Sequence, residues 1–186
     1  MNDFKNPFGK YNGNEADYAL KFLNSENNDE GKFPWVQEFE KKFCELSGAK
    51  YAISVSSATA GLHTALLACG VSKGHEVIQP AMTVVMNAFT TIMSNANPVF
   101  VDIDKKTWNI DVNKIEKEIN KNTKVIMPVS LFGLPSDLKP IMDIAKKNGL
   151  YVIDDCAETI CGLYNNKFAG IDADIAVYSF ENKKHM

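Results

Sequence analysis

Short apolar runs and stretches of helical periodicity alternate along most of the chain. The apolar runs predict β-strands at residues 51–55, 77–79, 98–101, 124–129, 151–153 and 175–179. Helical spacing predicts helices at residues 15–24, 59–68, 84–94, 112–120 and 138–148, and another that begins at Pro34 and ends at a Gly48 cap. Gly149 is a second predicted helix cap.

The strand runs are nearly all apolar, which is typical of a parallel sheet buried on both faces. Strand followed by helix, repeated, predicts an α/β fold: a three-layer, open, mostly parallel sheet with helices on both faces. Residues 1–32 are polar and Asn-rich, so we expect an N-terminal arm. Residues 33–186 are expected to form one domain, since no repeat or linker interrupts them.

Composition and charge narrow the function classes. The chain of 186 residues has a net charge of -3 and scattered lysines, so we expect no nucleic-acid or membrane partner. It has no apolar leader and no uninterrupted apolar span, which favours a cytoplasmic protein. The four cysteines lie in apolar segments without metal-ligand spacing, so we expect reduced, buried thiols and no metal.

Ligands of an open α/β sheet bind outside the carboxyl ends of its strands. Ser57, Ala58 and Thr59 lie between a predicted strand and helix, where free N–H groups accept an anion or the side chains merely cap the helix. Asp155 follows the 151–153 strand, and either it or Asp154 is expected to cap the next turn.

The last predicted strand leads to Ser179 and then to a candidate nucleophile, Lys184, with Lys183 as a competitor. No GxGxxG and no GxxxxGK[ST] motif occurs, which disfavours a dinucleotide or P-loop site. An anion site, a buried acid, a hydroxyl and an amine at one sheet edge fit pyridoxal 5'-phosphate (PLP). This cofactor needs donors for its phosphate, a carboxylate for its ring nitrogen and a lysine for its aldehyde.

The chain resembles the DegT/StrS-type nucleotide-sugar aminotransferases of the aspartate aminotransferase superfamily from about Phe33 to its last residue. The segments that carry the resemblance are VQEFEKKFCELSGAKYAISVSSATAGLHTALLACGV, GHEVIQPAMTVVMNAF, NPVFVDIDKKTWNID, TKVIMPVSLFGLPSDLKPIMDIAKKNGLYVIDDCAETICGLY and AVYSFENKKH. The stretch Cys156-Ala157-Glu158 is similar to a perosamine-synthase-like branch that makes 4-amino sugars.

The resemblance implies roles for individual residues. It places Lys184 at the Schiff-base lysine, which also moves the substrate proton, and Asp155 at the ring-nitrogen aspartate. The other implied cofactor contacts are Ser57, Ala58, Thr59, Val84, Glu158 and Ser179. Val84 stands where the family usually has a stacking aromatic residue, and Ala58 where it usually has glycine.

The resemblance further implies an incomplete PLP-dependent transferase large domain, without the C-terminal small domain. We therefore expect a fragment of a PLP-dependent aminotransferase. It would transfer an amino group, expected to come from glutamate, to a nucleotide-linked keto-sugar, and it would work as a homodimer. Two alternatives stay open. One is a truncated or degenerate non-catalytic chain. The other is a sugar 3-dehydratase, in which histidine replaces the lysine; His185 is adjacent to Lys184.

Overall fold

The computed structural model describes residues 14–24, 34–181 and 184. The chain divides into two compact units, Met1–Ser54 and Val55–Met186, and each is described by itself. The predicted boundary between residues 32 and 33 stays a prediction. Lys183 and His185 lie outside the described residues.

The described residues of the first unit form the helices α1 (Glu15–Leu23) and α2 (Pro34–Ser47). Acidic side chains lie in the first turn of α1 and Lys21 in its last, which matches the helix dipole. No residue of α1 is buried. α2 is followed by Gly48 at a φ of 79°, so the predicted glycine cap is confirmed.

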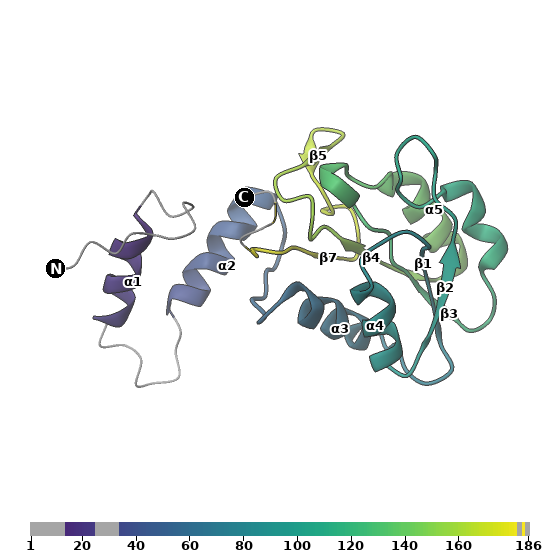
Figure 1. Cartoon of the computed structure of the whole chain (residues 1–186), viewed down its shortest axis with the longest axis horizontal. Helices are drawn as coiled ribbons and strands as arrows, with labels where there is room; N and C mark the ends of the chain where they lie inside the picture. Colours follow the sequence, from purple (N-terminus) through teal and green to yellow (C-terminus); the bar gives the residue numbers. More distant parts are fainter. Residues whose placement is uncertain (1–13, 25–33, 182–183, 185–186) are drawn as a thin grey trace. The chain divides into compact units, whose positions relative to one another are not determined.

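The second unit is built on a five-stranded sheet (Figure 1). Its strands run parallel in the order β2-β1-β3-β4-β7. Their bounds are β1 (Glu76–Pro80), β2 (Asn97–Val101), β3 (Thr123–Ile126), β4 (Tyr151–Asp155) and β7 (Ile175–Val177). All the strands therefore end at one edge, where the sequence predicts the site.

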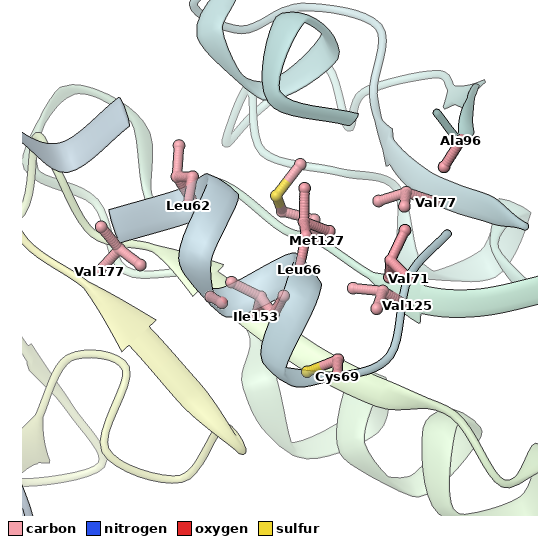
Figure 2. Packing of buried hydrophobic residues seen from close by; sticks show 11 residues of the cluster. Leu62, Leu66, Cys69, Val71, Val77, Ala96, Val125, Met127, Ile153 and Val177 are labelled. Atoms are coloured by element: carbon pink, nitrogen blue, oxygen red, sulfur yellow. The ribbon is translucent and has the colours of Figure 1, made fainter. Parts of the chain in front are cut away.

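Helices cover both faces of the sheet, which confirms the predicted three-layer α/β fold. α3 (Ala58–Ala68) and α4 (Met86–Met93) lie against each other, and α3 packs its Leu62 and Leu66 against one face of the sheet (Figure 2). α5 (Leu138–Asn148) packs Leu138 and Ile141 against the other face, and Gly149 caps it in the left-handed conformation as predicted.

Alternating strand residues supply the two cores, because successive side chains point to opposite faces. The α3 core contains Val77, Val125 and Ile153. The α5 core contains their neighbours Ile78, Ile126 and Val152. These six side chains are fully buried, so the near-continuous apolar runs reflect burial on both faces.

Two predicted elements are wrong. Residues 51–55 form no strand, and Ile53 is 81% exposed. A strand forms only where a neighbouring strand accepts and donates its backbone hydrogen bonds. The sheet ends at β7, and residues 51–55 pair with none of its strands. The predicted helix 112–120 is two short 3-10 turns, η2 (Val112–Lys114) and η3 (Glu116–Glu118). Its β-branched residues and Asn113 disfavour a longer α-helix.

A small β-hairpin and the 3-10 turn η4 (Leu131–Gly133) were not predicted. The strands β5 (Leu163–Tyr164) and β6 (Lys167–Phe168) pair antiparallel as a hairpin. Asn165 and Asn166 join them, both at positive φ. Two consecutive asparagines that tolerate this conformation are the sequence signal that could have indicated the turn.

The cysteines only partly match their prediction. All four are free thiols, and Cys69 and Cys156 are buried. Cys161 is exposed and Cys44 is half-buried, so burial was wrong for these two. Cys161 lies in a turn at a φ of 59°, outside the packed layers. Among the described residues, no helix is long and apolar enough to cross a membrane.

Candidate active site

The carboxyl group of Asp155 ends β4 and is buried, with 4% of the residue exposed. Its Oδ2 accepts a hydrogen bond from Asn87 Nδ2 of α4 at 2.9 Å. Its Oδ1 accepts one from the backbone N–H of Ala157 at 3.0 Å, so Asp155 caps the turn that follows the strand. Asn87 Oδ1 in turn accepts from Thr83 Oγ1 at 2.9 Å.

Asn87 is a candidate site residue that was not predicted from the sequence. It is fully buried, as are Thr90 and Thr91 on the same side of α4, whereas Phe89 and Ile92 are exposed. This helix therefore turns a polar face towards the sheet. The signal lay in the sequence: Asn87 and Thr91 are four residues apart within the predicted helix 84–94, a spacing that places polar groups on one helix face.

Asp154 faces the opposite side of β4 and has different partners. Ser130 Oγ donates to its Oδ1 at 3.2 Å, and Cys156 Sγ donates to its Oδ2 at 3.2 Å. Burial raises the pKa of Asp154 to about 7, against the opposing effect of these hydrogen bonds. Of the two neighbouring acids, Asp155 is the one that accepts a hydrogen bond from α4, through Asn87.

Lys184 and Glu158 form an ion pair. Lys184 Nζ lies 3.0 Å from Glu158 Oε1, and the two side chains are 26% and 18% exposed. The backbone N–H of Phe132 donates to the other oxygen, Glu158 Oε2, at 3.2 Å. The positive charge of Lys184 also acts on Asp155 and partly offsets the rise that burial causes in its pKa. The structure therefore brings Lys184, Glu158 and Asp155 to one sheet edge.

The predicted anion site is the beginning of α3. Ser57 caps this helix, because its side chain accepts a hydrogen bond from the backbone N–H of Ala60 at 3.1 Å. The capping interpretation is thus confirmed, while anion binding stays a prediction. Ala58 and Thr59 form the first turn and are half-buried, so their N–H groups lie at the positive end of the helix dipole.

Close packing places this turn against β7. A Cβ on Gly61 would lie 2.9 Å from Cγ1 of Val177, so α3 approaches the strand more closely than another residue would allow. Ser179 follows Val177 by two residues, and its hydroxyl accepts from the N–H of Glu181 at 3.3 Å. Val84 precedes α4 and is 40% exposed.

The residues present fit PLP in one testable respect. A buried carboxyl such as Asp155 is costly to ionise, and burial raises its pKa accordingly. A cationic N–H donor beside it would reverse that effect, because an opposite charge favours the ionised form. The protonated ring nitrogen of PLP is such a donor, and the amine of Lys184 lies at the same edge.

The fold is a parallel α/β sheet, and a buried acid and a paired lysine lie at its carboxyl edge. This combination is the one expected of a PLP-dependent enzyme. The sequence matches the model of the DegT/DnrJ/EryC1/StrS aminotransferase family over residues 10–186. The chain belongs to this family, which confirms the resemblance inferred from its motifs.

Individual relatives agree with this assignment. GDP-perosamine synthase of Escherichia coli O157:H7 is 41% identical over 172 residues, which cover 92% of this chain and 47% of the relative. The aminotransferase from Psychrobacter cryohalolentis superposes with a TM-score of 0.88 at 34% identity, covering 96% of this chain and 45% of that one. The chain spans about half the length of the curated relatives it matches.

Two further solved structures bear on the chemistry. NtdA from Bacillus subtilis, with bound cofactor PMP, has a TM-score of 0.74 at 35% identity, covering 82% of this chain and 35% of that one. GDP-4-keto-6-deoxymannose-3-dehydratase (ColD), as its H188N mutant, also has a TM-score of 0.74, at 28% identity, and covers 78% of this chain and 39% of that one.

Proposed function

We propose that this chain is the cofactor-holding part of a PLP-dependent aminotransferase that acts on a nucleotide-linked keto-sugar. The Lys184–Glu158 ion pair at the edge where Asp155 lies buried carries the proposal. Family membership and the relatives that are GDP-perosamine synthases support the reaction class and the kind of substrate. The lysine at position 184 argues against the dehydratase alternative.

In this proposal the chain's own residues divide the work. Asp155 holds the ring-nitrogen proton, while Asn87 and the N–H of Ala157 fix the orientation of the carboxylate. The first turn of α3 and Ser179 bind the phosphate, and Val84 packs beside the ring. Lys184 holds the cofactor and then moves the proton at the substrate carbon. When bound, PLP supplies an electron sink that no side chain provides.

Glu158 has a distinct part in the proposal. Its carboxylate keeps the amine of Lys184 at the sheet edge before the cofactor arrives, because a charge-assisted hydrogen bond at 3.0 Å restricts a long side chain. We further propose, from the family alone, that glutamate is the amino donor and that the whole protein is a cytoplasmic homodimer.

The test is the absorbance spectrum of the purified chain with PLP, before and after borohydride, followed by peptide mapping. We expect a visible band and a reduced cofactor adduct on Lys184. Lys184→Arg should remove both. Lys139→Arg, at an exposed lysine that pairs with Asp143 on α5, is the matched control and should change neither.

A wild-type chain with no band, or with label spread over several surface lysines, would contradict the proposal for this chain. The non-catalytic alternative would then account for it. A band and adduct that survive Lys184→Arg would instead overturn the lysine assignment.

A further inference from the structure

The loop that contacts Glu158 has an unusual backbone. It follows β3, and its Phe132 and Gly133 are both left-handed, at φ of 52° and 85°. Glycine adopts this conformation freely, but phenylalanine does not. Such a conformation persists only where the surroundings hold it, and it tends to occur at functional sites.

The side-chain amide of Asn109 holds this loop. Its Oδ1 accepts from the N–H of Leu131 at 3.2 Å. Its Nδ2 donates to the carbonyl oxygens of Leu134 at 3.1 Å and Pro135 at 3.3 Å. Asn109 is 5% exposed, so these bonds are shielded from water. One amide therefore bonds the backbone on both sides of the left-handed pair.

No other side chain of similar size reproduces this pattern. Aspartate can accept from Leu131 but would turn a second oxygen towards two carbonyl oxygens. Leucine offers neither a donor nor an acceptor. Asn109 follows Trp108, itself left-handed at a φ of 64°, whose ring contacts that of Phe132 at a centroid distance of 6.0 Å. The ring contact and the bonds of Asn109 thus both join the Trp108–Asn109 segment to the Phe132 loop.

Two successive hydrogen bonds connect the loop that Asn109 holds to Lys184. The N–H of Phe132 lies 3.2 Å from Glu158 Oε2, and Glu158 Oε1 lies 3.0 Å from Lys184 Nζ. Thr159, next to Glu158, donates through Oγ1 to the carbonyl oxygen of Ser130 at 2.5 Å. The Glu158 turn and the loop therefore form one connected unit.

We propose that Asn109 is a positioning residue for Lys184. By fixing the left-handed Phe132–Gly133 turn, it aims the N–H of Phe132 at Glu158, and Glu158 in turn restrains the amine. This rests on the proposed function only in naming Lys184 as the reactive lysine. Asn109 itself touches neither the lysine nor Glu158 in these contacts.

The experiment compares Asn109→Ala and the near-isosteric Asn109→Asp with a matched control, Asn113→Ala, in the full chain. Asn113 is exposed, and its side-chain amide donates to the nearby Asp111. The first readout is hydrogen exchange at the amides of Leu131 and Phe132. The second is the acetylation rate of Lys184 by acetic anhydride, relative to the exposed Lys139 in the same molecule.

We expect both Asn109 variants to speed exchange at Leu131 and Phe132 at least tenfold and to speed Lys184 acetylation severalfold. Asn113→Ala should change neither. In a Glu158→Gln background, where the carboxylate is already lost, Asn109→Ala should add nothing to the acetylation rate. This loss of additivity is the signature of an effect that passes through Glu158.

Faster loop exchange with unchanged Lys184 reactivity would overturn the proposal, because Asn109 would then support the loop alone. So would an equally large effect on Lys184 in the Glu158→Gln background, or unchanged exchange at the loop. Neither readout uses the cofactor. A chain that fails to take up PLP would therefore refute the proposed function and leave this inference standing on its own test.

Discussion

Two adjacent carboxyl groups at the end of β4 are buried in different surroundings. Asp154 bonds Ser130 and Cys156, whereas Asp155 bonds Asn87 and the following turn. Burial raises the pKa of both. Asp155 lies at the edge where a cationic group can offset this effect, while Asp154 lies among hydroxyl and thiol groups.

The pH dependence of stability should report on Asp154. Its pKa is raised from 3.8 to about 7, so the folded state holds a proton that the unfolded chain releases. The stabilisation is complete below pH 3.8 and is lost as pH rises through about 7. We expect this group to lower the free energy of unfolding by roughly 1.4 kcal/mol per pH unit within that window.

Urea unfolding of the wild type and Asp154→Asn between pH 4 and 8 measures this dependence. Asparagine has nearly the same shape as aspartate but cannot ionise. The free energy of unfolding of the variant should therefore fall less steeply with rising pH than that of the wild type, by up to roughly 1.4 kcal/mol per pH unit. Equal slopes in the two proteins would show that Asp154 is already ionised in the folded state, contrary to the prediction.

Asp155→Asn should weaken cofactor binding while sparing the fold. An amide keeps the volume and one acceptor but cannot supply a negative charge to a ring N–H. We expect the apparent Kd for PLP to rise about 10- to 100-fold, the size of a charge-assisted hydrogen bond. Spectroscopic titration measures it, with Asp154→Asn as the neighbouring control. Equal losses in both variants would mean that neither acid has a special place at the ring.

At the scale of elements, two left-handed glycines offer a direct comparison. Gly149 caps α5 at a φ of 66°, and a Cβ added there would meet no atom within 4 Å. Gly170 has a φ of 84°, and a Cβ there would lie 2.6 Å from Cβ of Ala176 and 2.8 Å from Sγ of Cys156. At Gly149 only the left-handed backbone conformation favours glycine. At Gly170 a side chain would also clash with its neighbours.

Gly149→Ala should therefore cost about 1 kcal/mol of unfolding free energy, from backbone strain. Gly170→Ala should cost roughly 1–3 kcal/mol more, because the core around Cys156 must also move. Chemical denaturation of both variants tests this order. If Gly149→Ala were the more damaging, the close contacts at Gly170 would be relieved at little cost.

The sequence predicts an element well where its local pattern and its packing in the fold favour the same structure. α5 combines an apolar stripe with a cap at Gly149, and both its ends were predicted. Residues 51–55 have the composition of a strand, but strand formation depends on a partner that no local pattern reveals. The 3-10 turns η2 and η3 follow Asp111, whose side chain caps η2 by accepting from the N–H of Asn113, but neither turn contains a buried residue that would help to sustain a longer helix.

At the scale of the whole molecule, the sequence predicted the sheet edge at which the site lies. It did not predict the hydrogen bonds that connect the residues of the site. The carboxyl ends of the strands indicated Asp155 and the candidate Lys184, and the family resemblance added Glu158 and favoured Lys184 over Lys183. Neither the strand ends nor the resemblance singled out Asn87 or Asn109, and the polar spacing around Asn87 indicated a helix face but not its partner Asp155. Their contacts join residues 68 and 22 positions apart, and those distances are fixed only when the helices and loops pack on the sheet.

Hydrogen exchange across the chain should show the same hierarchy. The nine residues of α1 include no buried side chain, and helices this short are marginal without packing. In β1, β3 and β4, by contrast, fully buried residues lie at the centre of the sheet. We therefore expect the amides of α1 to exchange fastest and those of Ile78, Ile126 and Val152 slowest, near the rate set by global unfolding.

Added PLP should then change this map locally. New protection is expected at the first turn of α3 and at the turn after Asp155, since these would hold the phosphate and the ring. The β5–β6 hairpin, an element without predicted cofactor contacts, serves as the internal control. Protection spread equally over hairpin and sheet edge would indicate general stabilisation of the fold, whereas protection confined to the edge would locate the cofactor among the residues proposed here.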